Sequence, residues 1–98
     1  MYRIEYSPLI ERHMRSLTAR QRSIVFAAAE RQLRSEPAVE TRNRKPLRPN
    51  PIAPWELRIG DLRVYYEVHE VPDRIVQVLA VGLKVRDLVR IGREVMKL

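Results

Sequence analysis

The chain has 98 residues, no cysteine, and 19 Lys and Arg against 12 Asp and Glu, which gives a formal net charge of +7. This length suits one domain, residues 1–98, with a single core, and the charge favours a polyanionic partner, either nucleic acid or an acidic protein. The absence of cysteine excludes disulfides, thiolate zinc sites and thiol nucleophiles and indicates a reducing, cytoplasmic location. A membrane span is not expected, because no stretch approaches ~18 uninterrupted apolar residues, and the charged N-terminal residues do not resemble a signal peptide.

The first elements are a short strand and a short helix. Residues 2–6, YRIEY, alternate with period two, which predicts a strand. Ser7 and Pro8 have the pattern of an N-cap followed by proline at the first helical position. The helix that follows has one apolar face, formed by Leu9, Ile10, His13, Met14 and Leu17. We interpret His13 as a packed, hydrogen-bonded histidine of the core.

A second helix begins directly after the first. Thr18 and Gln21 have the spacing of a capping box. The stripe expected to face the core consists of Ile24, Val25, Ala28, Ala29 and Leu33. Pro37 ends the helix, because the residue before a proline avoids the helical region. The two helices therefore form a helical hairpin.

Residues 37–54 contain five of the seven prolines and four basic residues. A loop of this length in so small a domain is usually functional or poorly ordered. Its basic residues are equally compatible with a solvated charged segment and with a contact to RNA.

Three strands follow, at 55–59, 62–71 and 74–81, joined by turns at Gly60 and Pro72. In the first, the inward residues are Trp55, Leu57 and Ile59, and the outward ones are Glu56 and Arg58. In the second, one face carries Leu62, Val64, Tyr66 and Val68, and the other carries Arg63, Tyr65, Glu67 and His69. The third is apolar on both faces except at Gln77, as expected of a central strand. We interpret Trp55 as a core anchor.

The tail from 85 to 98 has Leu88, Ile91, Val95 and Leu98 at helical spacing, which predicts a short C-terminal helix weakened by Gly92. The predicted fold class is therefore α+β. It has an antiparallel sheet of about four strands with the N-terminal helical hairpin packed on one face. The first strand returns through two helices and can pair in parallel with the last strand.

The stretch WELRIGDLRVYYEV at 55–68, followed by VLAVGLK at 78–84, resembles the core signature of the RelE/ParE superfamily of bacterial toxin–antitoxin toxins. The resemblance covers the whole chain and implies a RelE-like fold. Many members of this superfamily cut mRNA on the ribosome, and some inhibit DNA gyrase. The fold does not choose between these activities.

In the RelE-like ribonucleases, basic residues on these strands surround the scissile phosphate. The resemblance carries this catalytic role to Arg58, Arg63 and Lys84. It also implies a substrate-binding set, formed by Lys45, Arg48, Glu56, Tyr65, Arg86 and Arg90. It implies no metal and no cofactor. Each basic residue also has a structural interpretation, as a cross-strand partner or part of a solvated face.

Two positions depart from the family pattern. Glu56 stands where the ribonucleases commonly have a second basic residue, and Arg90 stands where they often have Tyr or His. Arginine does not exchange protons near neutral pH. A ribonuclease would therefore draw its proton carriers from Glu56, Lys45, Lys84, Tyr65 or His69. We interpret Glu56 as an ion-pair partner of Arg58 or Arg63, and His69 as lying away from the site.

Two functions remain open. The first is a toxin that acts as a metal-free endoribonuclease on mRNA, in association with the ribosome, and inhibits translation. The alternative is a ParE-like inhibitor of DNA gyrase, or a catalytically inactive toxin fold that acts only by binding protein. Either implies a cognate antitoxin, an acidic protein that wraps around the toxin.

Overall fold

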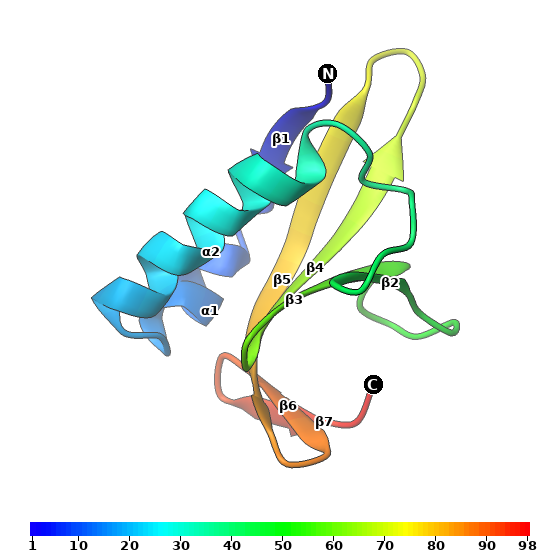
Figure 1. Ribbon diagram of the computed structural model, residues 1–98. Coiled ribbons are helices and arrows are strands. Elements are labelled where there is room, and N and C mark those ends of the chain that lie inside the picture. The colour runs from blue at the N-terminus through cyan, green and yellow to red at the C-terminus, as the bar shows by residue number, and fades with distance from the viewer.

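A seven-stranded sheet with two helices on one side forms the structure, a computed structural model that describes residues 1–98 (Figure 1). The helices are α1 (Ile10–Arg15) and α2 (Ala19–Leu33). The strands are β1 (Arg3–Tyr6), β2 (Arg44–Pro46), β3 (Trp55–Ile59), β4 (Leu62–His69), β5 (Ile75–Val85), β6 (Leu88–Ile91) and β7 (Glu94–Met96). The fold is therefore α+β, with more strands than the four expected.

The sheet order is β2-β3-β4-β5-β6-β7, and β1 pairs with β5 off this path. The β3–β4–β5 meander is antiparallel, as the alternation predicted. β1 runs parallel to β5, from Arg3 opposite Ile75 to Tyr6 opposite Val78, which confirms the predicted pairing through the helical hairpin. The extra strands are β2, inside the proline-rich loop, and the C-terminal pair β6 and β7.

α2 begins and packs as its sequence predicts. The Thr18 hydroxyl accepts a hydrogen bond from the Gln21 amide, and the Gln21 side chain accepts one from the Thr18 amide. These two bonds satisfy donors that a helix start leaves without partners. The residues buried against the sheet are Val25, Ala28, Ala29 and Leu33. Neither helix has the length and apolar character that crossing a bilayer requires.

The predicted C-terminal helix is wrong, because residues 85–96 form a β-hairpin that continues the sheet. Val85 pairs with Leu88 and Ile91 pairs with Glu94, so two-residue turns close both connections. Arg86 and Gly92 have φ angles of +60° and +64° at these turns, a conformation that a right-handed helix does not contain. The apolar spacing that suggested a helix is also produced by two short strands with two-residue turns.

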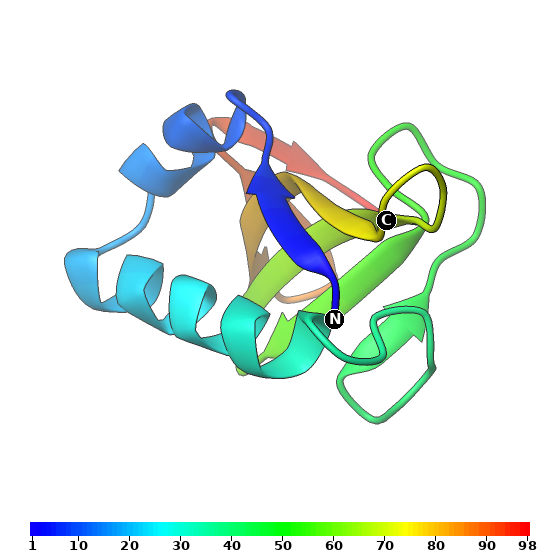
Figure 2. The same cartoon turned by 90° about the horizontal axis from the view of Figure 1, so that it is seen from above.

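Apolar side chains pack on both faces of the sheet. The larger cluster lies between the helices and the sheet, and Trp55 packs against it, stacked on Tyr66 with ring centroids 6.1 Å apart. The smaller cluster on the other face contains Ala53, Tyr65, Ala80, Val89 and Ile91. Figure 2 shows the helices on one side of β1 and β5 and the proline-rich loop on the other. This second, loop-covered face carries most of the predicted site residues.

Candidate functional site

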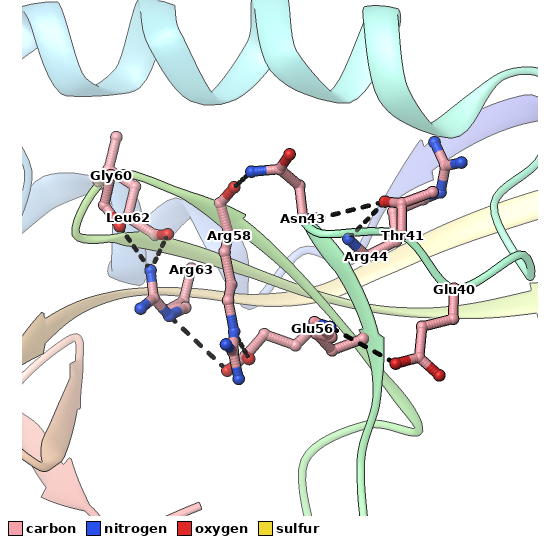
Figure 3. Close-up of polar contacts among 10 residues, drawn as sticks. Glu40, Thr41, Asn43, Arg44, Glu56, Arg58, Gly60, Leu62 and Arg63 are labelled. Carbon is pink, nitrogen blue, oxygen red and sulfur yellow. Dashed lines mark hydrogen bonds and ion pairs between the residues drawn. The ribbon is translucent and has the colours of Figure 1, made fainter.

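An acidic side chain lies between two arginines on the sheet face opposite the helices (Figure 3). Oε2 of Glu56 accepts a hydrogen bond from Nε of Arg58 over 2.7 Å, and Oε1 of Glu56 lies 3.8 Å from Nε of Arg63. Glu56 and Arg58 are two residues apart on β3, and Arg58 lies opposite Arg63 on β4. Strand alternation therefore places the three side chains on one face. We call these three residues the Glu56 cluster.

Arg63 is held at the end of the β3–β4 hairpin. Its side chain is 8% exposed. Its Nη1 donates hydrogen bonds to the carbonyl oxygens of Gly60 and Leu62, over 2.8 and 2.9 Å. Its Nη2 makes no hydrogen bond within the protein. A guanidinium keeps its charge near neutral pH. The two carbonyls and the Glu56 carboxylate therefore stabilise a permanent, buried cation whose Nη2 has no hydrogen-bond partner.

Glu56 was expected to point outward with Arg58, but it is buried, whereas Arg58 is exposed. Its side chain is 7% exposed. A buried carboxylate is stable only when it is paired, and both arginines supply that pairing. The interpretation of Glu56 as an ion-pair partner is confirmed. Together the three side chains carry a net charge of +1.

Tyr65 lies directly opposite Glu56 on β4. Its side chain is fully buried, and its hydroxyl has no hydrogen-bond partner. Burial raises the pKa of the phenol, and the nearby Glu56 carboxylate raises this pKa further, while Arg63 and Arg58 oppose the shift. Tyr65 is therefore a neutral, protonated group with an unused donor beside the Glu56 cluster.

The loop before β3 orients Arg58 through its backbone. The Arg58 amide donates to the Asn43 carbonyl over 2.8 Å, and the Asn43 side-chain amide donates to the Arg58 carbonyl over 3.0 Å. The side chain of the neighbouring Arg44 caps α2 by donating to the Gln32 carbonyl over 2.8 Å. Sequence reasoning did not single out Asn43, because an asparagine in a proline-rich loop has no pattern that indicates its partner.

Three other predicted site residues lie on the strands and the turn around the cluster. Lys84 is exposed, and strand alternation puts it on the same face as Gly82, which lies opposite Arg63. Lys45 lies opposite Glu56 on β2 and pairs with Glu40 over 3.5 Å. Arg86 is exposed in the β5–β6 turn.

Two predicted substrate-binding arginines are not brought to the cluster. Arg90 lies on the opposite face of the hairpin, where its Nη2 donates to the Ser16 carbonyl at the end of α1 over 3.3 Å. Arg48 lines a separate cavity of about 380 Å³ under the proline-rich loop. His69 is exposed at the far end of β4 and pairs with Glu67, away from the cluster as expected.

A larger cavity, of about 880 Å³, lies between α1, residues 51–52 and the C-terminal hairpin. Neither cavity is lined by Arg58, Arg63 or Lys84. His13 borders the larger one. As predicted, it is partly buried and hydrogen-bonded, since its Nδ1 accepts from the Val81 amide over 3.3 Å. Sequence reasoning missed this cavity because its wall includes β7, which was expected to be helical.

No protein-family model and no curated protein matches this sequence. The fold is similar to a solved chain described as the toxin–antitoxin complex RelBE2 from Mycobacterium tuberculosis. The TM-score is 0.71 with 25% sequence identity, and the match covers 85% of this chain and 98% of that chain.

Proposed function

This chain belongs to the RelE/ParE superfamily, and from that premise we propose that it is the toxin of a type II toxin–antitoxin module and a metal-free endoribonuclease. Its substrate is mRNA, cut in association with the ribosome in the cytoplasm, and the consequence is inhibited translation. The similarity to a chain from a toxin–antitoxin complex supports the toxin role. The Glu56 cluster supports the choice of a ribonuclease.

The observation that carries this function is the carboxylate of Glu56 between the guanidinium groups of Arg58 and Arg63. RNA is cut without a metal when a 2′-hydroxyl attacks the adjacent phosphorus. The reaction needs a base for the hydroxyl proton, cations for the phosphorane, and an acid for the leaving oxygen. In the Glu56 cluster, the Glu56 carboxylate would be the base, and the guanidinium groups of Arg58 and Arg63 would be the cations.

In the proposed reaction, Glu56 accepts the 2′-hydroxyl proton while the 2′-oxygen forms a bond to phosphorus. The exposed guanidinium of Arg58 and the unused Nη2 of Arg63 stabilise the charge on the phosphorane oxygens. The bond from phosphorus to the 5′-oxygen then breaks, and the ammonium of Lys84, on the same face, protonates that oxygen. The products are a 2′,3′-cyclic phosphate and a 5′-hydroxyl.

A second candidate is a toxin that acts only by binding, including a ParE-like inhibitor of DNA gyrase. The observation that favours it is the confinement of Arg63. Two carbonyls and a carboxylate already occupy its guanidinium, and neither described cavity opens beside it. A substrate phosphate would have to displace the Glu56 carboxylate from Arg58 before it could bind.

The deciding experiment induces the toxin in cells, maps the 5′ ends of mRNA, and measures plasmid supercoiling in the same cultures. Arg58→Ala is the main variant because Arg58 is exposed, and Arg20→Ala is its matched control on the surface of α2. Cuts that disappear in Arg58→Ala and persist in Arg20→Ala support the ribonuclease. Intact mRNA with relaxed or broken plasmid supports the binding toxin instead.

Arg63→Ala tests the buried cation of the Glu56 cluster. Because Arg63 is buried, circular dichroism must first show that the Arg63→Ala protein is folded. Its activity can then be compared with that of the natural chain. A folded Arg63→Ala protein that still cuts mRNA at the original rate would remove Arg63 from the proposed mechanism.

The proposed partner is an acidic antitoxin that wraps around the toxin. The net charge of +7 is complementary to such a protein and to RNA. Binding of either should weaken steeply as salt rises, because neutralised phosphates or carboxylates release counterions.

A further inference from the structure

Tyr65 carries a buried hydroxyl that nothing in the folded chain uses. Its neighbour Tyr66 is equally buried, but the Tyr66 hydroxyl donates to the Pro37 carbonyl over 2.7 Å. The side chains that cluster with Tyr65 are apolar and come from Ala53, Ala80, Val89 and Ile91. A buried polar group without a partner destabilises a fold and is rare, and functional sites are one place where such a group is retained.

The polar group beside this hydroxyl is the carboxylate of Glu56. Glu56 lies directly opposite Tyr65 across the β3–β4 pair, and such positions have Cβ atoms about 4.5–5.5 Å apart. Burial is the largest cause of the raised pKa of the phenol, and the Glu56 carboxylate raises that pKa further. The Tyr65 hydroxyl therefore keeps its proton near neutral pH, and it can donate a hydrogen bond to a carboxylate.

Binding of a phosphate changes the partners of Glu56. In the free protein, Glu56 accepts a hydrogen bond from Arg58 over 2.7 Å and lies 3.8 Å from Nε of Arg63 (Figure 3). A phosphate that binds the exposed guanidinium of Arg58 takes the first of these partners away. The Glu56 side chain is only 7% exposed, so water cannot fully replace the lost hydrogen bond. The buried carboxylate then needs another donor.

Two groups flank Glu56 on the neighbouring strands and could supply that donor. Lys45 lies opposite Glu56 on β2, but its Nζ is 3.5 Å from a carboxylate oxygen of Glu40. A move of Lys45 to Glu56 would therefore break an existing ion pair. The Tyr65 hydroxyl has no hydrogen bond to give up, which makes it the favoured donor when Glu56 turns away from Arg58.

We propose that Tyr65 is a positioning residue, whose hydroxyl donates to the Glu56 carboxylate when a substrate phosphate binds Arg58 and so keeps the base inside the site. The inference rests on the proposed ribonuclease and deepens it. Tyr65 retains its proton throughout, so it holds Glu56 without taking part in the proton transfer. The hydroxyl that lacks a partner in the free protein gains one in the RNA-bound state, and this difference favours binding of RNA.

The first test measures binding without cleavage. Fluorescence anisotropy follows an RNA oligonucleotide with fluorine in place of every 2′-hydroxyl, which removes the nucleophile. Tyr65→Phe should weaken binding by about tenfold, because it removes a hydrogen bond to a charged acceptor that exists only in the complex. Tyr6→Phe is the matched control, since it removes a hydroxyl from a half-buried tyrosine on the helix side of the sheet, and it should leave the affinity unchanged.

The second test asks whether Tyr65 acts through the charge of Glu56. The same Tyr65→Phe change is measured in a Glu56→Gln background. A hydrogen bond to an ionised acceptor is roughly twice as strong as one to a neutral acceptor. The loss of affinity should therefore shrink from about tenfold to about threefold or less. An equal loss in both backgrounds would overturn the proposed role, because a contact with another group would not depend on this carboxylate.

A spectroscopic test observes the hydroxyl directly. In a chain whose tyrosines carry ¹³C at Cζ, the atom bonded to the hydroxyl, the Tyr65 resonance is identified by its absence from Tyr65→Phe. It should shift when the fluorinated oligonucleotide binds, whereas the Tyr66 resonance should stay in place. A Tyr65 resonance that does not move in the complex would overturn the proposal.

The failure of this inference differs from the failure of the proposed function. Cleavage of cellular mRNA together with equal affinities of the natural chain and Tyr65→Phe would reject the role of Tyr65 alone. Intact mRNA together with weaker binding by Tyr65→Phe would reject the ribonuclease and retain the contact between Tyr65 and Glu56. A natural chain that neither cuts RNA nor binds the oligonucleotide would reject both.

Discussion

Oε1 of Glu56 on β3 lies 3.8 Å from Nε of Arg63 on β4, and both side chains are less than a tenth exposed. A buried pair of opposite charges contributes little net stability, but removing one partner is costly because the other stays buried and unpaired. The same two side chains therefore serve the proposed chemistry and the stability of the β3–β4 hairpin. Variants at either position must therefore preserve shape while changing charge.

Glu56→Gln should bind RNA more tightly and cut it more slowly. The amide removes the negative charge between Arg58 and Arg63 but cannot accept the 2′-hydroxyl proton. RNA binding can be measured by fluorescence anisotropy with an oligonucleotide that carries 2′-deoxyribose at the cut site and so is not cut. The affinity of Glu56→Gln should fall more steeply with salt than that of the natural chain, by the equivalent of about one additional phosphate contact. Cleavage of the matching RNA should fall by about 100-fold or more. Glu67→Gln on β4 is the control, and an equal effect there would contradict a specific role of Glu56.

Removing the hydroxyl groups of two adjacent tyrosines should have different effects on the free energy of unfolding. The Tyr65 hydroxyl is buried without a partner, whereas the Tyr66 hydroxyl donates to the buried Pro37 carbonyl over 2.7 Å. Tyr65→Phe should leave the free energy of unfolding unchanged or raise it. Tyr66→Phe should lower it by about 1–2 kcal/mol, since it leaves an acceptor unpaired. Urea unfolding at pH 7 measures both, and a loss of stability in Tyr65→Phe would show that its hydroxyl has a partner.

Gly82→Ala should loosen the C-terminal hairpin. A Cβ at Gly82 would lie 2.8 Å from the Arg90 carbonyl oxygen and 2.8 Å from a methyl carbon of Val89. Because the first of these atoms is backbone, β6 must shift, at a cost of about 1–3 kcal/mol. Hydrogen exchange should show reduced protection in β6 and β7. Gly60→Ala is the comparison, because its strain comes from a φ of +57° with no atom within 4 Å, and protection of β6 should survive it.

Stability should fall in mild acid through His13. Burial lowers the pKa of the imidazole, Arg12 lowers it further, and Glu94 partly opposes the shift. The unfolded chain, with an ordinary histidine pKa near 6.5, then binds the proton more readily than the folded chain. The contribution of neutral His13 is complete above that value and is lost as pH falls toward the lower, folded pKa.

The check compares the free energy of unfolding of the natural chain with that of His13→Gln between pH 7.5 and about pH 5. Glutamine keeps an acceptor for the Val81 amide but does not titrate. The natural chain should lose more stability than the variant over this range. Parallel curves would mean that protonation of His13 is not coupled to folding.

The agreement between sequence and structure is closest where a local pattern decides the outcome. The capping box at Thr18 begins α2 as expected, and strand alternation separated the two faces of β4 correctly. The order of elements also allowed the parallel pairing of β1 with β5 that the structure shows. Each of these depends on neighbours within a few residues or on the connection between consecutive elements.

The sequence by itself determined which residues share a face, where α2 begins and how the central meander pairs, because periodicity and capping are properties of short segments. Only the tertiary structure decided that residues 85–96 are two strands, that Glu56 and Arg63 are buried together, and that Arg90 contacts α1. The physical reason is that periodicity assigns a side chain to a face but carries no information about which distant segment covers that face.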